Sequence, residues 1–122
     1  MTREDKNLLL KDLCARLPYG VKLDTLEGPQ ELDTRWLTIN ICNISSPYLP
    51  YLFPLSSMTE EQKKEYCSLV WFDGLSAGWN RDDAVILNEV EMLIDFYHKN
   101  HLDWRGLIEK GLAIDATGLN IY

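Results

Sequence analysis

The chain has 122 residues, a size typical of one domain, and its 46% hydrophobic and 25% charged residues are typical of a globular protein. Nineteen acidic residues against twelve basic ones give a net charge of −7 at pH 7. This charge repels phosphate backbones and anionic lipids, so we expect no direct binding of nucleic acid or membrane. We predict a single domain over residues 1–122.

The cysteines and the N-terminal residues favour a cytoplasmic protein. Cys14, Cys42 and Cys67 are odd in number and widely spaced, which fits neither a disulfide framework nor a C-x-x-C site. The first residues lack the basic-then-apolar order of a signal peptide, and no apolar run approaches the roughly 18 residues of a membrane span. We expect a cytoplasmic location and thiols that pack as small hydrophobes.

A capping signature opens the first predicted helix. Thr2 is followed three residues later by Asp5, and leucines then recur at helical spacing, so we expect a helix over residues 3–16. Pro18 cannot continue this helix, and Gly20 is a typical residue after a helix end. The N-terminal segment is therefore predicted to be helical.

Two segments of β-type composition follow. Residues 21–26 alternate apolar with polar side chains, and residues 35–44 mix tryptophan, leucine and isoleucine with threonine and asparagine. Gly28 and Pro29 supply a turn between them. We expect two strands that pair as a small antiparallel hairpin.

A proline-rich segment comes next. Pro47, Pro50 and Pro54 interrupt a run of aromatic residues and leucines. Because proline lacks the N–H group that a sheet needs, this pattern predicts an extended crossover that lies across the core and is not a central strand.

The second half is predicted to be mainly helical. Thr59 and Gln62 repeat the capping signature and begin a helix that ends near Gly74. A glycine-containing connection then leads to the strongest periodic pattern of the chain, which predicts a helix over residues 82–99. Its expected apolar face is Ile86, Val90, Leu93, Ile94 and Tyr97.

A short terminal helix over residues 103–110, capped by Asp103, completes the predicted fold, and residues 115–122 carry no assignment. The fold class is therefore α+β: an N-terminal helix, a small antiparallel β element, a proline-rich crossover, two main helices and a short terminal helix. The residues expected to supply much of the core are Leu9, Leu13, Leu37, Ile39, Leu69, Val70, Ile86, Val90, Leu93, Ile94 and Ile108.

Three segments resemble a known group of small proteins. They are Thr2 to Gly20, Pro47 to Thr59, and Asp103 to Ala113, the last of which reads Asp-Trp-Arg-Gly-Leu-Ile-Glu-Lys-Gly-Leu-Ala. The group is encoded in genomes of gut Bacteroidales and in their phages or mobile elements. It has no assigned activity, so the resemblance implies an origin in such an element and implies no mechanism.

His98 and His101 are the candidates for metal binding. With Asp95 one helical turn earlier, they would present two imidazoles and a carboxylate to zinc. A stable site needs three or four convergent ligands, however, and both histidines fall at a predicted helix end, where an imidazolium also stabilises the exposed carbonyl groups. We expect helix capping or a solvated surface here, and no metal or cofactor.

Two patterns resemble nucleophilic sites. Residues 74–78 match G-x-S-x-G around Ser76, but the preceding residues are predicted to be helical, whereas this motif requires a strand before the serine. Cys14 or Cys67 beside a histidine would form a thiol site, but cysteines on apolar helix faces usually only pack. Neither pattern predicts catalysis.

Aromatic and acidic side chains favour protein binding. Trp79 lies in the glycine-containing connection, directly after Gly78, and is the tryptophan we expect to be exposed. Glu91 and Asp95 lie on the polar side of the last long helix. We predict a non-enzymatic accessory role in which the chain binds a host or phage protein. Two alternatives stay open. One is a small hydrolase or metal-dependent enzyme that uses His98, His101 and a neighbouring carboxylate, and the other is an acidic nucleic-acid mimic that presents Glu91 and Asp95 to a basic groove.

Overall fold

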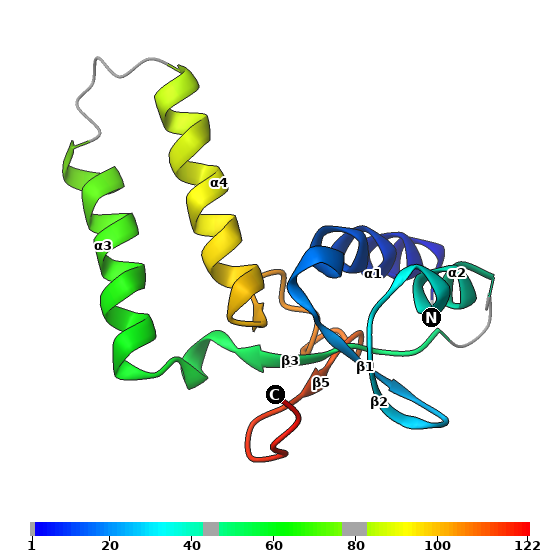
Figure 1. The fold of residues 1–122 in the computed structure, drawn as a ribbon. Helices are drawn as coiled ribbons and strands as arrows, with labels where there is room; N and C mark the ends of the chain where they lie inside the picture. Colours follow the sequence, from blue (N-terminus) through cyan, green and yellow to red (C-terminus); the bar gives the residue numbers. More distant parts are fainter. Residues whose placement is uncertain (1, 43–46, 77–82) are drawn as a thin grey trace.

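The computed structural model describes residues 2–42, 47–76 and 83–122, and gives only the helical backbone for residues 70–76 and 83–89. The fold is α+β, as predicted (Figure 1). In chain order the helices and strands are α1 (Arg3–Arg16), β1 (Lys22–Thr25), β2 (Gly28–Glu31), α2 (Thr34–Cys42), β3 (Tyr51–Pro54), α3 (Glu60–Ser76), α4 (Asp83–Lys99), β4 (Leu102–Asp103) and β5 (Ile114–Asp115). Short 3-10 turns cover Leu17–Tyr19 and Leu55–Ser57.

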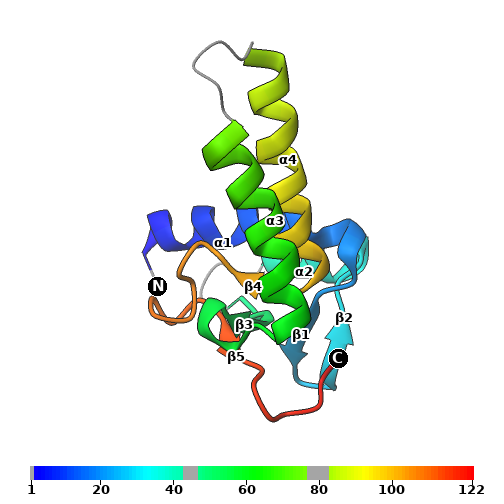
Figure 2. The ribbon, with the colours of Figure 1, turned by 90° about the vertical axis from the view of Figure 1, so that its left-hand side faces the viewer.

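The molecule has two parts, which we call the helical hairpin and the body. The helical hairpin consists of α3 and α4, and the body consists of the other described elements. Figures 1 and 2, which are views at right angles, both show the helical hairpin extending away from the body. Among the described residues, no helix combines the length and the apolar character that a membrane crossing requires.

The predicted capping box of α1 is confirmed, and so are the bounds of the helix. The Asp5 backbone N–H donates to Thr2 Oγ1 at 3.0 Å, and the Thr2 N–H donates to Asp5 Oδ2 at 3.4 Å. Leu9 and Leu13, one helical turn apart, lie on the buried face. Gly20 adopts a left-handed conformation, with φ of 74°, and turns the chain towards β1.

The predicted strand over residues 35–44 is wrong, because Thr34–Cys42 form α2. β1 pairs instead with β2, so Gly28 and Pro29 belong to a strand and not to the turn. The Asp33 carboxylate accepts a hydrogen bond from the Trp36 N–H at 2.9 Å, as an N-terminal cap does. Trp36 is buried towards the core, and this tertiary packing outweighs the β-type composition.

The expectation that the proline-rich segment is not a central strand is also wrong. β3 lies between β4 and β5 and pairs in parallel with both. Pro50 precedes this strand and Pro54 is its last residue, so the N–H groups between them remain free to donate. The Phe53 N–H donates to the His101 carbonyl at 2.8 Å, and the Pro50 carbonyl accepts from the Ile114 N–H at 2.8 Å.

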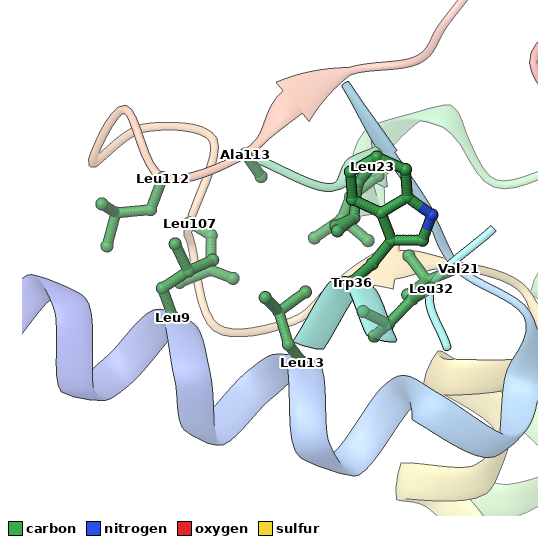
Figure 3. Packing of buried hydrophobic residues seen from close by; sticks show 10 residues of the cluster. Leu9, Leu13, Val21, Leu23, Leu32, Trp36, Leu107, Leu112 and Ala113 are labelled. Carbon is green, nitrogen blue, oxygen red and sulfur yellow. The ribbon is translucent and has the colours of Figure 1, made fainter. Parts of the chain in front are cut away.

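The core lies between α1, α2 and the strands (Figure 3). Its buried hydrophobic members are Leu9, Leu13, Val21, Leu23, Leu32, Trp36, Leu52, Leu107, Leu112 and Ala113. The prediction is confirmed for Leu9 and Leu13, whereas Leu37, Ile39 and Ile108 are half-buried and pack against this cluster. Leu69, Leu93 and Ile94 are half-buried as well. Val90 is exposed, contrary to prediction, and the side chains of Val70 and Ile86 lie outside the described residues.

In the second half the helix starts are confirmed and the terminal helix is not. Thr59 and Gln62 form the predicted capping box, with hydrogen bonds of 2.9 and 3.2 Å, but α3 continues to Ser76. α4 begins within one residue of its predicted start and ends at Lys99 as predicted. Residues 103–110 form β4 and turns, in which the Asp103 carboxylate accepts from the N–H groups of Leu107 and Ile108.

Candidate functional site

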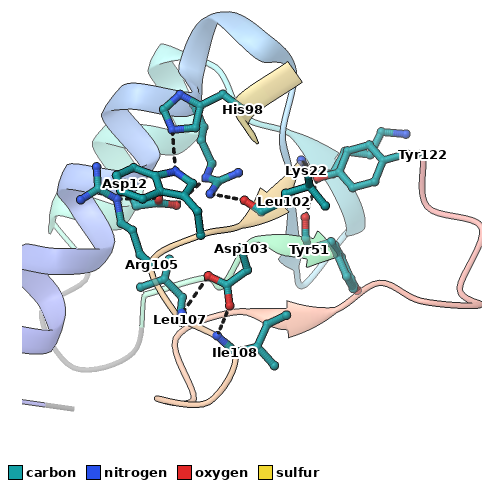
Figure 4. A network of polar contacts seen from close by, with 12 residues as sticks. Asp12, Lys22, Tyr51, His98, Leu102, Asp103, Arg105, Leu107, Ile108 and Tyr122 are labelled. Carbon is teal, nitrogen blue, oxygen red and sulfur yellow. Dashed lines mark hydrogen bonds and ion pairs between the residues drawn. The ribbon is translucent and has the colours of Figure 1, made fainter. Parts of the chain in front are cut away.

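A buried ion cluster joins α1 to the segment after α4 (Figure 4). Asp12 and Arg16, four residues apart on α1, form an ion pair with Nε 2.7 Å from Oδ2. Arg105 Nε lies 3.0 Å from the other carboxylate oxygen of Asp12, and Arg16 Nη2 donates to the Leu102 carbonyl at 2.7 Å. Among the described residues Arg16 Nη1 has no hydrogen-bond partner. The cluster thus holds one carboxylate between two cations.

His98 lies beside this cluster and is buried. Its Nε2 accepts a hydrogen bond from the Trp104 indole N–H at 3.1 Å, so this nitrogen carries no proton. Burial, and then the positive charge of Arg16, lower the pKa of His98 from 6.5 to about 4. The residue is therefore neutral at pH 7.

His101 is half-buried and sits in a left-handed backbone conformation with φ of 55°. Its ring stacks on Tyr122, with centroids 3.8 Å apart and planes 12° apart. Burial and the charge of Arg16 lower the pKa of His101 to about 4, and among the described residues its Nδ1 has no hydrogen-bond partner. The Tyr122 hydroxyl donates to the Tyr51 carbonyl at 2.7 Å and accepts from the Lys22 N–H at 2.8 Å.

The structure gives the three candidate metal ligands different partners. Asp95 is exposed and accepts a hydrogen bond from the Tyr19 hydroxyl, whereas His98 bonds to Trp104 and His101 stacks on Tyr122. Across the described part of the chain, no three His, Cys, Asp or Glu side chains gather as a metal site. The expectation of helix capping or a solvated surface is wrong for both histidines, because burial keeps them neutral.

The candidate nucleophiles also differ from expectation. Ser76 is the last residue of α3, so it follows a helix and not the strand that its motif requires. Cys14, Cys42 and Cys67 are all exposed, so the expectation that they pack as hydrophobes is wrong. Trp79, the tryptophan expected to be exposed, lies outside the described residues.

An aromatic cluster forms the base of the helical hairpin. Tyr66 of α3 lies against Phe96 and Tyr97 of α4, with ring centroids 6.2 and 6.3 Å apart. Tyr97 stacks in turn on Trp104, at 5.9 Å and 14°, and Trp104 bonds to His98. Two polar contacts between α3 and the end of α4 lie close by: Lys99 Nζ is 2.6 Å from Glu65 Oε1, and Gln62 donates to Asn100 at 3.1 Å. These contacts fix the two helices to each other and to the body.

Earlier in α4, on the N-terminal side of the aromatic cluster, apolar side chains are exposed to solvent. Val90 is 42% exposed and Met92 is 49% exposed. Glu91 and Asp95, the predicted interaction residues, are exposed on the same helix. The described part of the helical hairpin therefore presents apolar and acidic side chains together.

Sequence reasoning missed Asp12, Arg16 and Trp104. Asp12 and Arg16 share a helix face with Leu9 and Leu13, so their spacing alone signalled that two charges point towards the core. For Trp104 no comparable local signal exists, because its partners come from α4. Comparison of the chain with protein-family models, with curated proteins and with solved structures gives no match.

Proposed function

We propose that the protein is a non-enzymatic interaction protein that docks on a partner protein through its helical hairpin. The exposure of Val90 carries this proposal. Residues at spacings of three, four and seven share one side of a helix, and the apolar side of α4 holds Val90, Leu93, Ile94 and Tyr97. Amphipathic helices normally bury this side against a core. Here Val90 is 42% exposed and the other three are only half-buried.

The charge of the helical hairpin indicates the chemistry of the partner. Residues 60–99 contain nine acidic and four basic residues, so this segment accounts for most of the net negative charge. Glu91 directly follows Val90 and is exposed. A partner surface that surrounds apolar side chains with Lys and Arg would match both features. From the resemblance of three sequence segments to small proteins of Bacteroidales mobile elements, we further propose that this partner is a host or phage protein.

The base of the helical hairpin supports the proposal in a different way. The contacts of Tyr66 with Phe96 and Tyr97 hold α3 and α4 together, and the stacking of Tyr97 on Trp104 fixes α4 to the body. A surface that is already ordered loses less conformational entropy when it binds. The exposed side of α4 is therefore presented in a defined orientation.

A capture experiment with two matched double variants tests this function. Val90→Gln with Glu91→Lys changes the helical hairpin, and Leu26→Gln with Glu27→Lys makes the same type of change at the turn between β1 and β2, where Leu26 is 92% exposed. Tagged full-length protein is used to capture proteins from a lysate of the source organism. We expect one partner to bind the wild type and the turn variant equally, and to be lost from the hairpin variant.

Two results would overturn the proposal. One is a partner that the hairpin variant retains as well as the wild type does. The other is hydrolysis of a small substrate by the purified protein that His98→Gln abolishes, because this would support the enzymatic alternative. Circular dichroism of each variant shows whether the fold is intact.

A further inference from the structure

A small pocket between α1 and α2 lies outside the helical hairpin and outside the ion cluster. It has a volume of about 130 Å³. Its lining consists of Arg3, Lys6, Asn7 and Leu10 of α1, Asn40 and Ile41 of α2, and Pro47. Sites for whole small molecules usually occupy about 300–1,000 Å³, so this pocket has room for a single side chain. A side chain that belongs to another protein is therefore its natural occupant.

The two cations of the pocket lie at the N-terminal end of α1, where positively charged side chains lower the stability of a helix. Arg3 is the first residue of the helix and Lys6 follows within the first turn. The N-terminal end of a helix carries partial positive charge, so cations there lower helix stability, whereas a bound carboxylate would raise it. Among the described residues neither Arg3 nor Lys6 forms an ion pair. The nearby Asp5 carboxylate is directed to the Thr2 N–H.

The rest of the pocket lining combines the apolar side chains of Leu10, Ile41 and Pro47 with the amides of Asn7 and Asn40. Ile41 is 54% exposed and Leu10 is half-buried, so both offer surface to a ligand. Asn40 is buried, and its side-chain amide exchanges two hydrogen bonds of 2.9 Å with the backbone of Tyr48. The buried Pro47 adds a rigid wall. A ligand in this pocket therefore meets both apolar surface and two cations.

We propose that this pocket binds a segment of a partner protein in which an apolar side chain of about leucine size is flanked by carboxylates. The apolar side chain fills the space between Leu10 and Ile41, and the carboxylates face Arg3 and Lys6. This site and the helical hairpin have opposite charge, so they select different partners. A nucleic acid would also meet these cations, but the net charge of −7 opposes its approach.

Titration of the full-length, isotope-labelled chain with two synthetic peptides tests the proposal. The first is a helical peptide with leucine and with glutamate one turn before and after it, and the second has glutamine in place of glutamate. We expect the first peptide to shift the amide signals of residues 3–10 and 40–42, and the second to bind about tenfold more weakly or not at all.

Two variants of α1 form a matched pair for this titration. Lys6→Glu removes a cation from the pocket, and Lys11→Glu makes the same change at an exposed position that does not line it. Lys6→Glu places a carboxylate near the positive end of the helix, so it does not weaken α1, and lost binding reports on the pocket itself. We expect Lys6→Glu to weaken the first peptide at least about tenfold and Lys11→Glu to leave its affinity nearly unchanged.

Three outcomes would overturn the proposal. They are equal binding of the two peptides, equal effects of the two variants, and an absence of shifts at millimolar peptide. Inorganic phosphate and a single-stranded oligonucleotide serve as further probes. If either shifts the same signals and the first peptide does not, the pocket binds phosphate groups and the assignment to an acidic protein segment is wrong.

Discussion

Arg16 and Asp12 form an ion pair in which both side chains are 0% exposed, with Arg16 Nε 2.7 Å from Asp12 Oδ2. Arg105 reaches the second carboxylate oxygen from the segment after β4. A charge withdrawn from water is stable only beside its counter-charge, so the two arginines and the aspartate depend on one another. The cluster therefore ties the C-terminal third of the chain to the first helix.

Asp12→Ala is expected to lower the free energy of unfolding by about 3–5 kcal/mol, because Arg16 would remain buried without its carboxylate. Urea denaturation of the two proteins measures the difference. Glu60→Ala is the control, since Glu60 pairs with Lys63 at the surface, with side-chain exposures of 86% and 51%. Glu60→Ala should lower the free energy of unfolding by less than about 1 kcal/mol. An equally small decrease for Asp12→Ala would contradict the prediction.

Stability is expected to fall as the pH is lowered from about 6.5 to about 4. The pKa of His98 and that of His101 are both lowered from 6.5 to about 4. Within this window the unfolded chain takes up protons that the folded protein does not, so acid favours unfolding; above it both states are neutral and the effect vanishes. Each histidine contributes up to about 3 kcal/mol to this loss. Denaturation curves across the window measure it.

The double variant His98→Gln with His101→Gln is the control for this pH dependence. Glutamine does not titrate, and at residue 98 its carbonyl oxygen can still accept from the Trp104 indole. The variant should keep the part of the acid response that comes from carboxylates and lose the part above about pH 5. An unchanged slope between pH 6.5 and pH 5 would show that the histidines are solvated.

Leu52→Ala is expected to destabilise the protein by about 2–5 kcal/mol, because Leu52 is fully buried in the central strand β3 and its loss leaves a cavity. Leu55→Ala, three residues further along, removes the same atoms from a side chain that is 38% exposed, and should cost much less. Thermal or urea unfolding compares the two variants. Equal losses would contradict the placement of β3 in the core.

All three thiols are expected to react with Ellman's reagent in the folded protein, because Cys14, Cys42 and Cys67 are exposed. The number of thiols that react without denaturant is compared with the number that react in guanidinium chloride. A thiol that reacts only after unfolding would contradict the structure. Replacing each cysteine by serine in turn identifies the signal of each residue.

The features that the sequence predicts correctly are local ones. The capping boxes of Thr2 with Asp5 and of Thr59 with Gln62 involve residues three positions apart, so their pattern is visible in the sequence and both exist in the structure. The same holds for the long periodic pattern of α4. Where backbone and side chains interact within a few residues, composition and spacing are sufficient.

Tertiary packing decides the features that were predicted wrongly. Residues 34–42 have a β-type composition, but Asp33 caps a helix and Trp36 docks on the core. β3 is central only because β4 and β5, much later in the chain, pair with it. In the candidate site, the low pKa of His98 comes first from burial and then from the charge of Arg16, and the fold produces both. These relationships join distant segments, so spacing along the chain does not reveal them.

The parallel pairing of β3 with β4 and β5 also has a consequence for the order in which the molecule folds. β3 contains residue 51, whereas its partners begin at residues 102 and 114. The chain must close these long loops before the strands can form their contacts. The conformational entropy lost on loop closure therefore slows folding. During synthesis on the ribosome, α1 can form early, but the three-stranded sheet cannot assemble until residue 115 has left the exit tunnel. Until then the edge of β3 that pairs with β5 is unpaired and open to chaperones.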